Sequence, residues 1–331
     1  MIVKGKYFVL LIIYGALMVT TSLSSEADES EDNIDYRYEM RSFVEKISSY
    51  GKAVNENFLI IPQNGQELFT YEGYADGEPV HSYINAIDGV GREDLFYGYT
   101  GDDILTPDNA NEYMLGFLDL AEKLGIEVLT IDYCSTVSKM KRSYEENRKR
   151  GFISFSADSR GLDNIPHYPA VPYNENERDM DSLSQASNFL YLINPEKLPV
   201  RKQMISALSS TNFDLLIIDL FDNDGELLSS EDIESLKRKD NGGRRLVIAY
   251  MSIGEAEDYR YYWQNEWDNN LPVWIEKENP HWRGNYKVRY WEPTWQELIL
   301  GSENSYLDLI LKAGFDGVYL DIIDGFEYFE N

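Results

Sequence analysis

The stretch GFDGVYLDIIDGFEYFEN, residues 314–331, decides the fold class of this chain. Its apolar run, residues 318–320, has the composition of a fully buried strand in a parallel sheet. Asp321 follows directly, at the position where α/β barrels place the polar residues of the active-site mouth. A helix should follow such a strand, yet only ten residues come after Asp321. The stretch therefore predicts an α/β barrel whose next helix comes from elsewhere in the chain.

Apolar runs that predict buried strands recur along the chain, separated by amphipathic stretches such as residues 111–124 and 303–313. The runs are residues 58–61, 84–87, 128–131, 152–155, 189–193, 215–218, 246–250, 288–291 and 318–320. Strands that alternate with helices over this length predict an α/β fold, a TIM-type (β/α)8 barrel. Since there are nine runs for eight places, we expect one of them to be peripheral.

The N-terminal residues have the organisation of a secretory signal peptide. Lys4 and Lys6 precede an apolar run at residues 7–19 and then small residues, so residues 1–23 are the predicted signal. An uncleaved membrane anchor is the alternative, and it is the only membrane contact that we expect. Residues 24–35 are acidic and Ser-rich, which predicts a disordered spacer. We expect residues 36–331 to form a single barrel domain that is secreted or on the cell surface.

The composition argues against several kinds of partner and cofactor. A net charge of −28 is unfavourable for binding nucleic acid, whose phosphates require a basic surface. Cys134 is the only cysteine, so an internal disulfide is impossible, and three scattered histidines make a zinc site improbable. We expect a monomer with no metal and no cofactor. The acidity would suit a cationic substrate.

Carboxylates and amides follow almost every predicted strand. Strand ends of a barrel converge on one mouth, so this pattern predicts a polar, acidic site there. All six tryptophans fall between residues 263 and 295, and aromatic rings both stack on sugars and fill cores. A sugar-binding mouth is the main interpretation. Binding of a hard cation through oxygen ligands is the alternative.

Three longer strings are similar to signatures of a known family. VIAYMSIGEAEDYR (247–260), VRYWEPTW (288–295) and GFDGVYLD (314–321) resemble the endo-α-1,4-polygalactosaminidase-like glycoside hydrolases. These are secreted TIM-barrel enzymes that cleave galactosaminogalactan-type polysaccharides. The resemblance therefore implies a secreted glycoside hydrolase acting on a galactosamine-containing or related polysaccharide. Without its acetyl groups, such a substrate is cationic.

The order of the family's segments differs in this chain. In the family, segments that resemble residues 58–65, 87–97 and 128–133 come after the strand that resembles residues 314–321, but here they come before it. The resemblance thus implies a circular permutation, with residues 161–187 joining the family's usual ends. The missing helix would be residues 36–50, whose apolar residues share one face. We expect the tail after Asp324 to lie beside the start of that helix.

Hydrolysis of a glycosidic bond needs two carboxyl groups. We expect Asp321 to be the nucleophile and Glu93 the acid/base, with two competing acids, Asp219 and Glu255. The predicted substrate-binding residues are Asn64, Asp88, Asp132, Tyr250, Tyr290, Trp291 and Asp324. Two alternatives remain open: a carbohydrate-binding barrel without catalysis, and a structural protein of the cell envelope.

Overall fold

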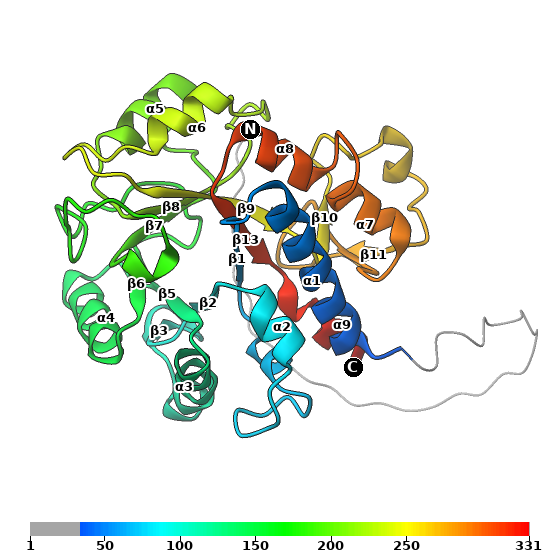
Figure 1. The fold of residues 1–331 in the computed structure, drawn as a ribbon, viewed down its shortest axis with the longest axis horizontal. Coiled ribbons are helices and arrows are strands. Elements are labelled where there is room, and N and C mark those ends of the chain that lie inside the picture. Colours follow the sequence, from blue (N-terminus) through cyan, green and yellow to red (C-terminus); the bar gives the residue numbers. More distant parts are fainter. Residues whose placement is uncertain (1–33, 331) are drawn as a thin grey trace, which may run out of the picture. The chain divides into compact units, whose positions relative to one another are not determined.

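The computed structural model describes residues 34–330 (Figure 1). The predicted signal peptide and most of the predicted spacer lie outside the described residues. Within residues 34–330, no helix is both long enough and apolar enough to cross a membrane.

Two parallel sheets form the centre of the fold. The first has five strands in the order β1 (Leu59–Pro62), β13 (Gly317–Asp321), β9 (Leu246–Ser252), β8 (Leu215–Ile218) and β7 (Phe189–Leu192). The second has three strands in the order β2 (Gly89–Glu93), β5 (Glu127–Tyr133) and β6 (Ile153–Ala157). A parallel bridge between Gln63 and Gly91 joins the sheets beside β1 and β2. At the other junction, the rings of Phe155 in β6 and Phe189 in β7 are 5.7 Å apart.

Helices surround these strands in Figure 1. They are α1 (Tyr36–Val54), α2 (His81–Ala86), α3 (Asp108–Lys123), α4 (Val137–Arg150), α5 (Arg201–Ser209), α6 (Ser230–Leu236), α7 (Pro293–Ile299), α8 (Tyr306–Ala313) and α9 (Phe326–Glu330). The predicted helices at residues 111–124 and 303–313 are confirmed as α3 and α8. Each is followed by a glycine with positive φ, Gly125 or Gly314, which lets the chain leave the helix without strain.

The remaining elements are short. They are the hairpin of β3 (Tyr97–Gly98) and β4 (Gly101–Leu105), the antiparallel strands β10 (Glu255–Glu257), β12 (Asn285–Val288) and β11 (Ile275–Glu278), and the 3-10 turns η2 (Gln66–Phe69), η3 (Leu183–Gln185), η4 (Asn265–Asp268) and η5 (Ile323–Gly325).

Seven of the nine predicted strands are confirmed as parallel strands. The run at residues 288–291 is the peripheral one, because only Val288 belongs to a strand, the antiparallel β12. The strand predicted at residues 84–87 is wrong: residues 81–86 form α2, and the strand is β2, which begins at Gly89. β2 contains few apolar residues because side chains from other strands already fill the space beside it. A Cβ atom at Gly91 would lie 1.9 Å from the hydroxyl oxygen of Tyr319.

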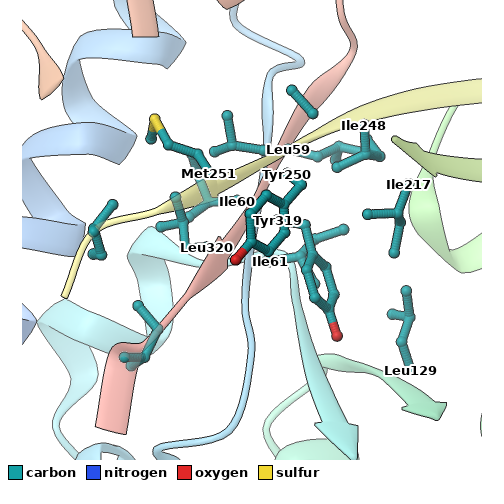
Figure 2. Close-up of a cluster of buried hydrophobic side chains, with 14 of the residues drawn as sticks. Leu59, Ile60, Ile61, Leu129, Ile217, Ile248, Tyr250, Met251, Tyr319 and Leu320 are labelled. Atoms are coloured by element: carbon teal, nitrogen blue, oxygen red, sulfur yellow. The ribbon is translucent and has the colours of Figure 1, made fainter. Parts of the chain in front are cut away.

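Large side chains fill the space between the strands. Figure 2 shows a cluster of them, with labelled residues from β1, β5, β8, β9 and β13. Tyr191, Tyr250 and Tyr319 come from β7, β9 and β13, and all three are buried. The Tyr191 ring is 5.2 Å from that of Tyr319 and 6.5 Å from that of Tyr250. These tyrosines therefore form an aromatic layer in the interior, next to the strand end that carries Asp321.

The two ends of the described chain meet. α9 packs on the first turn of α1, where Arg37 Nε and Glu330 Oε1 are 2.8 Å apart and the rings of Tyr36 and Phe329 stack at 5.4 Å. The predicted helix at residues 36–50 is confirmed as α1, with its apolar face buried. The expected position of the tail beside the start of α1 is thus confirmed.

Three aspartates lie just before the amino ends of parallel strands, and all three make the same two contacts. Each accepts a backbone N–H from a neighbouring segment and pairs with a lysine. Asp88 accepts from Ile60 at 2.9 Å and pairs with Lys52 at 3.0 Å; Asp214 accepts from Ser187 at 2.9 Å and pairs with Lys239 at 2.9 Å; Asp316 accepts from Val247 at 2.9 Å and pairs with Lys237 at 2.8 Å. The expectation that Asp88 follows a strand and binds substrate is therefore wrong, because it precedes β2.

Candidate active site

Asp321 lies at the carboxyl end of β13 with its carboxylate fixed on both sides. Oδ2 accepts a hydrogen bond from the Tyr250 hydroxyl at 2.7 Å, and Oδ1 accepts one from the backbone N–H of Ile322 at 2.8 Å. Burial and, next, the negative charge of Glu93 raise the pKa of Asp321 to about 7, although the hydrogen bonds from Tyr250 and Ile322 both lower it.

Glu93 is the last residue of β2, two strands from β13. Its Oε1 accepts a hydrogen bond from the Tyr133 hydroxyl, and its Oε2 accepts one from Asn64 Nδ2 at 3.3 Å. Asn64 also accepts from the backbone N–H of Glu93 at 3.3 Å. The structure thus brings together four residues that the sequence predicted for the site: Asp321, Glu93, Asn64 and Tyr250.

Tyr133 and Arg160 belong to the same site, although they were not among the predicted site residues. The Arg160 guanidinium lies 3.9 Å from the centre of the Tyr133 ring and is held by Asp94 at 2.8 Å and by Asp102 at 2.8 Å. Burial raises the pKa of Asp94 to about 6 in spite of the Arg160 charge. Arg160 therefore clamps the aromatic ring whose hydroxyl holds Glu93.

Asp324 lies in η5, three residues beyond Asp321. Burial raises its pKa to about 7, the charge of Glu327 adds to the effect, and the charge of Arg92 opposes it. Glu93 also raises the pKa of Asp324. The charge of Glu93 thus acts on Asp324 as it does on Asp321, and the contact of Asp324 with a substrate stays a prediction.

The competing acid Asp219 follows β8 and is fully engaged by an arginine. Its two oxygens accept from Nη1 and Nη2 of Arg260 at 2.9 and 2.7 Å. Arg260 is 7% exposed and also pairs with Glu257. Asp219 borders a pocket of about 370 Å³ that it shares with Arg260, the exposed Tyr259 and the loop after β8. The two hydrogen bonds from Arg260 do not support Asp219 as the second catalytic acid, and neither Asp321 nor Glu93 lines the pocket that Asp219 borders.

Glu255, the other competing acid, is 1% exposed and lies in β10. Its Oε1 accepts from Asn279 Nδ2 at 2.8 Å and pairs with Lys287 at 3.3 Å. Its Oε2 has no hydrogen-bond partner among the residues that the structure describes. With its carboxylate enclosed in the antiparallel sheet, Glu255 is not placed to reach a glycosidic bond.

The prediction that Asp132 binds substrate is wrong. Asp132 is fully buried and accepts hydrogen bonds from the backbone of Phe96 at 2.7 Å and from the Ser143 hydroxyl at 2.6 Å. Successive residues of a strand point to opposite sides, so Asp132 faces α4 while Tyr133 faces the interior. That alternation was visible in the sequence and would have selected Tyr133.

Tyr290 and Trp291 pack between α9 and the start of α1. Tyr290 is fully buried, and its hydroxyl donates to the backbone oxygen of Tyr36 at 2.8 Å, so the prediction that it contacts a sugar is wrong. The Trp291 ring lies 5.1 Å from that of Tyr36 and 4.7 Å from that of Phe329. Trp291 is partly exposed, and its contact with a sugar stays a prediction.

In residues 34–330, no three or more His, Cys, Asp or Glu side chains are arranged to hold a metal ion. The candidate site thus has Asp321 and Glu93 at the carboxyl ends of β13 and β2. Asp321 accepts from a phenol and a backbone N–H, and Glu93 accepts from a phenol and an amide. Such an arrangement can supply one proton and one carboxylate to a bond placed between them.

The chain is similar to proteins of other organisms. The chain is 43% identical over 181 residues to an uncharacterized protein of Methanocaldococcus jannaschii, a match that covers 54% of this chain and 49% of the relative. Uncharacterized proteins of Thermotoga maritima and Deinococcus radiodurans are 42% and 38% identical over 121 and 127 residues, which are 36% and 38% of their lengths. The matched part of the chain thus spans about half or less of each relative.

A family model matches residues 178–331, just under half of the chain, and its description is "Glycoside-hydrolase family GH114". The matched region contains Asp321 and Asp324, whereas Glu93 and Asn64 precede it. The mixed α/β fold with its parallel central strands is consistent with that family. The match supports a relationship of this chain to the glycoside hydrolases of family GH114.

Proposed function

We propose that this protein is a secreted or cell-surface glycoside hydrolase in which Asp321 and Glu93 are the two catalytic carboxyls. The observation that carries the proposal is the placement of these two carboxyls at the carboxyl ends of parallel strands, β13 and β2, where each accepts a hydrogen bond from a tyrosine hydroxyl. Burial and the charge of Glu93 raise the pKa of Asp321 to about 7, so a proton is still available near neutral pH. One carboxylic acid and one carboxylate are what glycoside hydrolysis requires.

In the proposed mechanism, the proton that Asp321 holds in the free protein passes to Glu93 when a sugar binds. The Asp321 carboxylate then attacks the anomeric carbon, and Glu93 protonates the oxygen of the departing sugar. Tyr250 and the Ile322 N–H stabilise the carboxylate of Asp321 before attack. After the leaving sugar departs, Glu93 has lost its proton and can accept one from the water that releases the product. Tyr133 and Asn64 hold Glu93 in place throughout.

The proposed substrate is a polysaccharide that contains galactosamine. The family match and the resemblance of residues 247–260 and 314–321 support this class. A net charge of −28 favours a polymer with free amines. Exposed rings in segments that follow β1 and β9, namely Tyr71, Tyr74 and Tyr259, offer surfaces on which sugars can stack.

We further propose that the two sheets close into one eight-stranded barrel and that the chain is a circular permutant of its family. The Gln63–Gly91 bridge and the Phe155–Phe189 contact support closure. The pairing of β1 with β13 and the packing of α9 on α1 support permutation. A chain rebuilt in the order 178–331 followed by 35–160 should fold and keep its activity. An unfolded product would contradict the permutation.

The activity is tested by incubating the protein with poly-α-1,4-galactosamine, its fully acetylated form and an uncharged glucan, and following reducing ends and product masses. We expect release from one or both galactosamine polymers and none from the glucan. If the free amines matter, release from the deacetylated polymer should fall as salt is raised. Binding to the polymers without release would favour a carbohydrate-binding barrel. No binding at all would favour a structural protein.

A further inference from the structure

Three strands of the site end in a residue with left-handed backbone conformation. Asn64 follows β1 with φ of 61°, Asp94 follows β2 with φ of 59°, and Ile322 follows β13 with φ of 57°. Asn and Asp adopt this conformation comparatively easily. Isoleucine does not, because its branched Cβ crowds the backbone there. Ile322 is thus the strained member of the three, and it directly follows Asp321.

The surroundings of Ile322 leave it little freedom. Its Cγ2 and carbonyl oxygen lie against Gly254, where an added Cβ would come within 2.6 Å of Cγ2 and 2.2 Å of the oxygen. The same Cγ2 lies 3.5 Å from the Cβ position of Gly325. Gly254 therefore makes room for the Ile322 side chain, whereas a Cβ at Gly325 would make an ordinary contact with it.

The peptide that joins Asp321 to Ile322 holds the Asp321 carboxylate. Its N–H, that of Ile322, donates to Oδ1 of Asp321 at 2.8 Å, and the contact of Ile322 with Gly254 fixes the far side of this peptide. On the other side, the N–H of Ile253, the neighbour of Gly254, donates to the backbone oxygen of Asp321 at 3.1 Å. The backbone of Asp321 is thus held by the turn at residues 253–254. Its carboxylate is held by Ile322, which packs against that turn.

We propose that Ile322 is a positioning residue that locks the Asp321 carboxylate for reaction through its strained contact with Gly254. The inference rests on the proposed catalytic role of Asp321. Strain of this kind persists only where the surrounding packing enforces it, and it is found at sites where geometry must be fixed. A relaxed residue would satisfy the backbone equally well but would leave the carboxylate free to turn.

The test compares Ile322→Gly with Ile322→Val. Glycine accepts the positive φ without strain but removes the wedge, whereas valine keeps the branched Cβ and an atom equivalent to Cγ2. We expect Ile322→Val to keep the kcat of the wild type. Ile322→Gly should lose about tenfold or more in kcat with an unchanged KM, since misplacement by about 1 Å can cost about a hundredfold. Its melting temperature should stay close to that of the wild type.

Carboxyl NMR of Asp321 provides a readout that needs no turnover. Loosening of the Ile322 N–H bond should raise the pKa of Asp321 in Ile322→Gly and leave it unchanged in Ile322→Val. A wild-type kcat in Ile322→Gly would overturn the proposal. So would a loss of activity that disappears after correction for the folded fraction. If the wild type hydrolyses nothing, the proposed function fails, and an unchanged pKa of Asp321 in both variants would separately overturn the lock.

Discussion

Acidic side chains have different kinds of partner at the two ends of the parallel strands. At the amino ends, Asp88, Asp214 and Asp316 each pair with a lysine and cap a neighbouring backbone N–H. At the carboxyl ends, the donors to Glu93 and Asp321 are uncharged: a phenol and an amide for one, a phenol and a backbone N–H for the other. The lysines at the amino ends neutralise the charges of the three aspartates. The uncharged donors at the carboxyl ends do not neutralise the charges of Glu93 and Asp321.

This difference separates stability from chemistry within one set of strands. A buried acid paired with lysine is inert, because its proton is lost and its oxygens are occupied. Acids that have no cation beside them keep a proton near neutral pH more readily and can transfer it. We therefore expect substitutions at the carboxyl ends to change activity far more than stability, and substitutions at the amino ends to do the reverse.

Apart from Asp321→Asn, which should abolish activity, the largest expected effect is on activity, from Glu93→Gln. Loss of the acid/base should lower kcat by about 10²- to 10⁴-fold. The melting temperature should hold or rise, because the repulsion between Glu93 and Asp321 disappears. Substrates with a good leaving group should be cleaved nearly normally in the first step, since they need no protonation. The opposite result would exchange the two roles. In that case Glu93→Gln would lose activity on substrates with a good leaving group, Asp321→Asn would keep it, and Glu93 would be the nucleophile.

The next effect is on stability, from Asp214→Asn. Lys239 and Asp214 are both completely buried, so removing the carboxylate leaves the Lys239 ammonium without its counter-charge. Breaking such a buried pair costs about 3–5 kcal/mol of unfolding free energy. Urea unfolding measures the loss, and kcat per folded molecule should not change. Asp88→Asn is the matched control, because its pair with Lys52 is only partly buried and the loss should be smaller.

A smaller effect on activity is expected from Tyr133→Phe. The Glu93 carboxylate would lose one of its two side-chain donors, and a hydrogen bond to a charged group contributes about 1.5–3 kcal/mol. We expect kcat to fall about tenfold or more, a change of about 1.4 kcal/mol for each factor of ten. Tyr144→Phe is the control, a buried phenol whose oxygen accepts from the Ser156 backbone at 3.2 Å. That variant should lose stability but not activity.

The smallest effect is on the pH dependence of stability. Asp321 and Asp324 have a pKa of about 7 in the folded protein, against an ordinary value of 3.8. Between these values the folded state binds more protons than the unfolded state, so stability should fall as the pH rises from about 4 to about 7. Both side chains are only half-buried, so solvent should weaken the effect. Melting curves of Asp324→Asn should show a flatter pH profile, and an unchanged profile would contradict this account.

The comparison also explains which parts of the molecule the sequence could predict. Seven parallel strands are continuous apolar runs, and Asp321 is recognisable because it directly follows one of them. β2 was missed because it has glycines where an apolar residue would be expected: Gly91 lies against Tyr319, and Gly89 lies against Leu183. That error moved Asp88 to the wrong end of a strand, whereas Glu93 is the last residue of β2.

Other errors arose from side-chain direction and from long-range packing. Asp132 and Tyr133 are adjacent at a strand end, and only the alternation of the strand decides which one faces the site. Tyr290 looked like a sugar contact because aromatic rings serve both purposes. Its partners, Tyr36 and Phe329, lie at the two ends of the described chain, and no local pattern reveals that contact.

The central claim is that Asp321 performs chemistry rather than merely binding. The most direct measurement compares wild type and Asp321→Asn for reducing-end release from poly-α-1,4-galactosamine and, in parallel, for binding to the same polymer by calorimetry. We predict that the wild type releases reducing ends, and that Asp321→Asn binds the polymer with similar affinity but releases none. Equal release by both proteins, or binding without release by the wild type, would contradict the account.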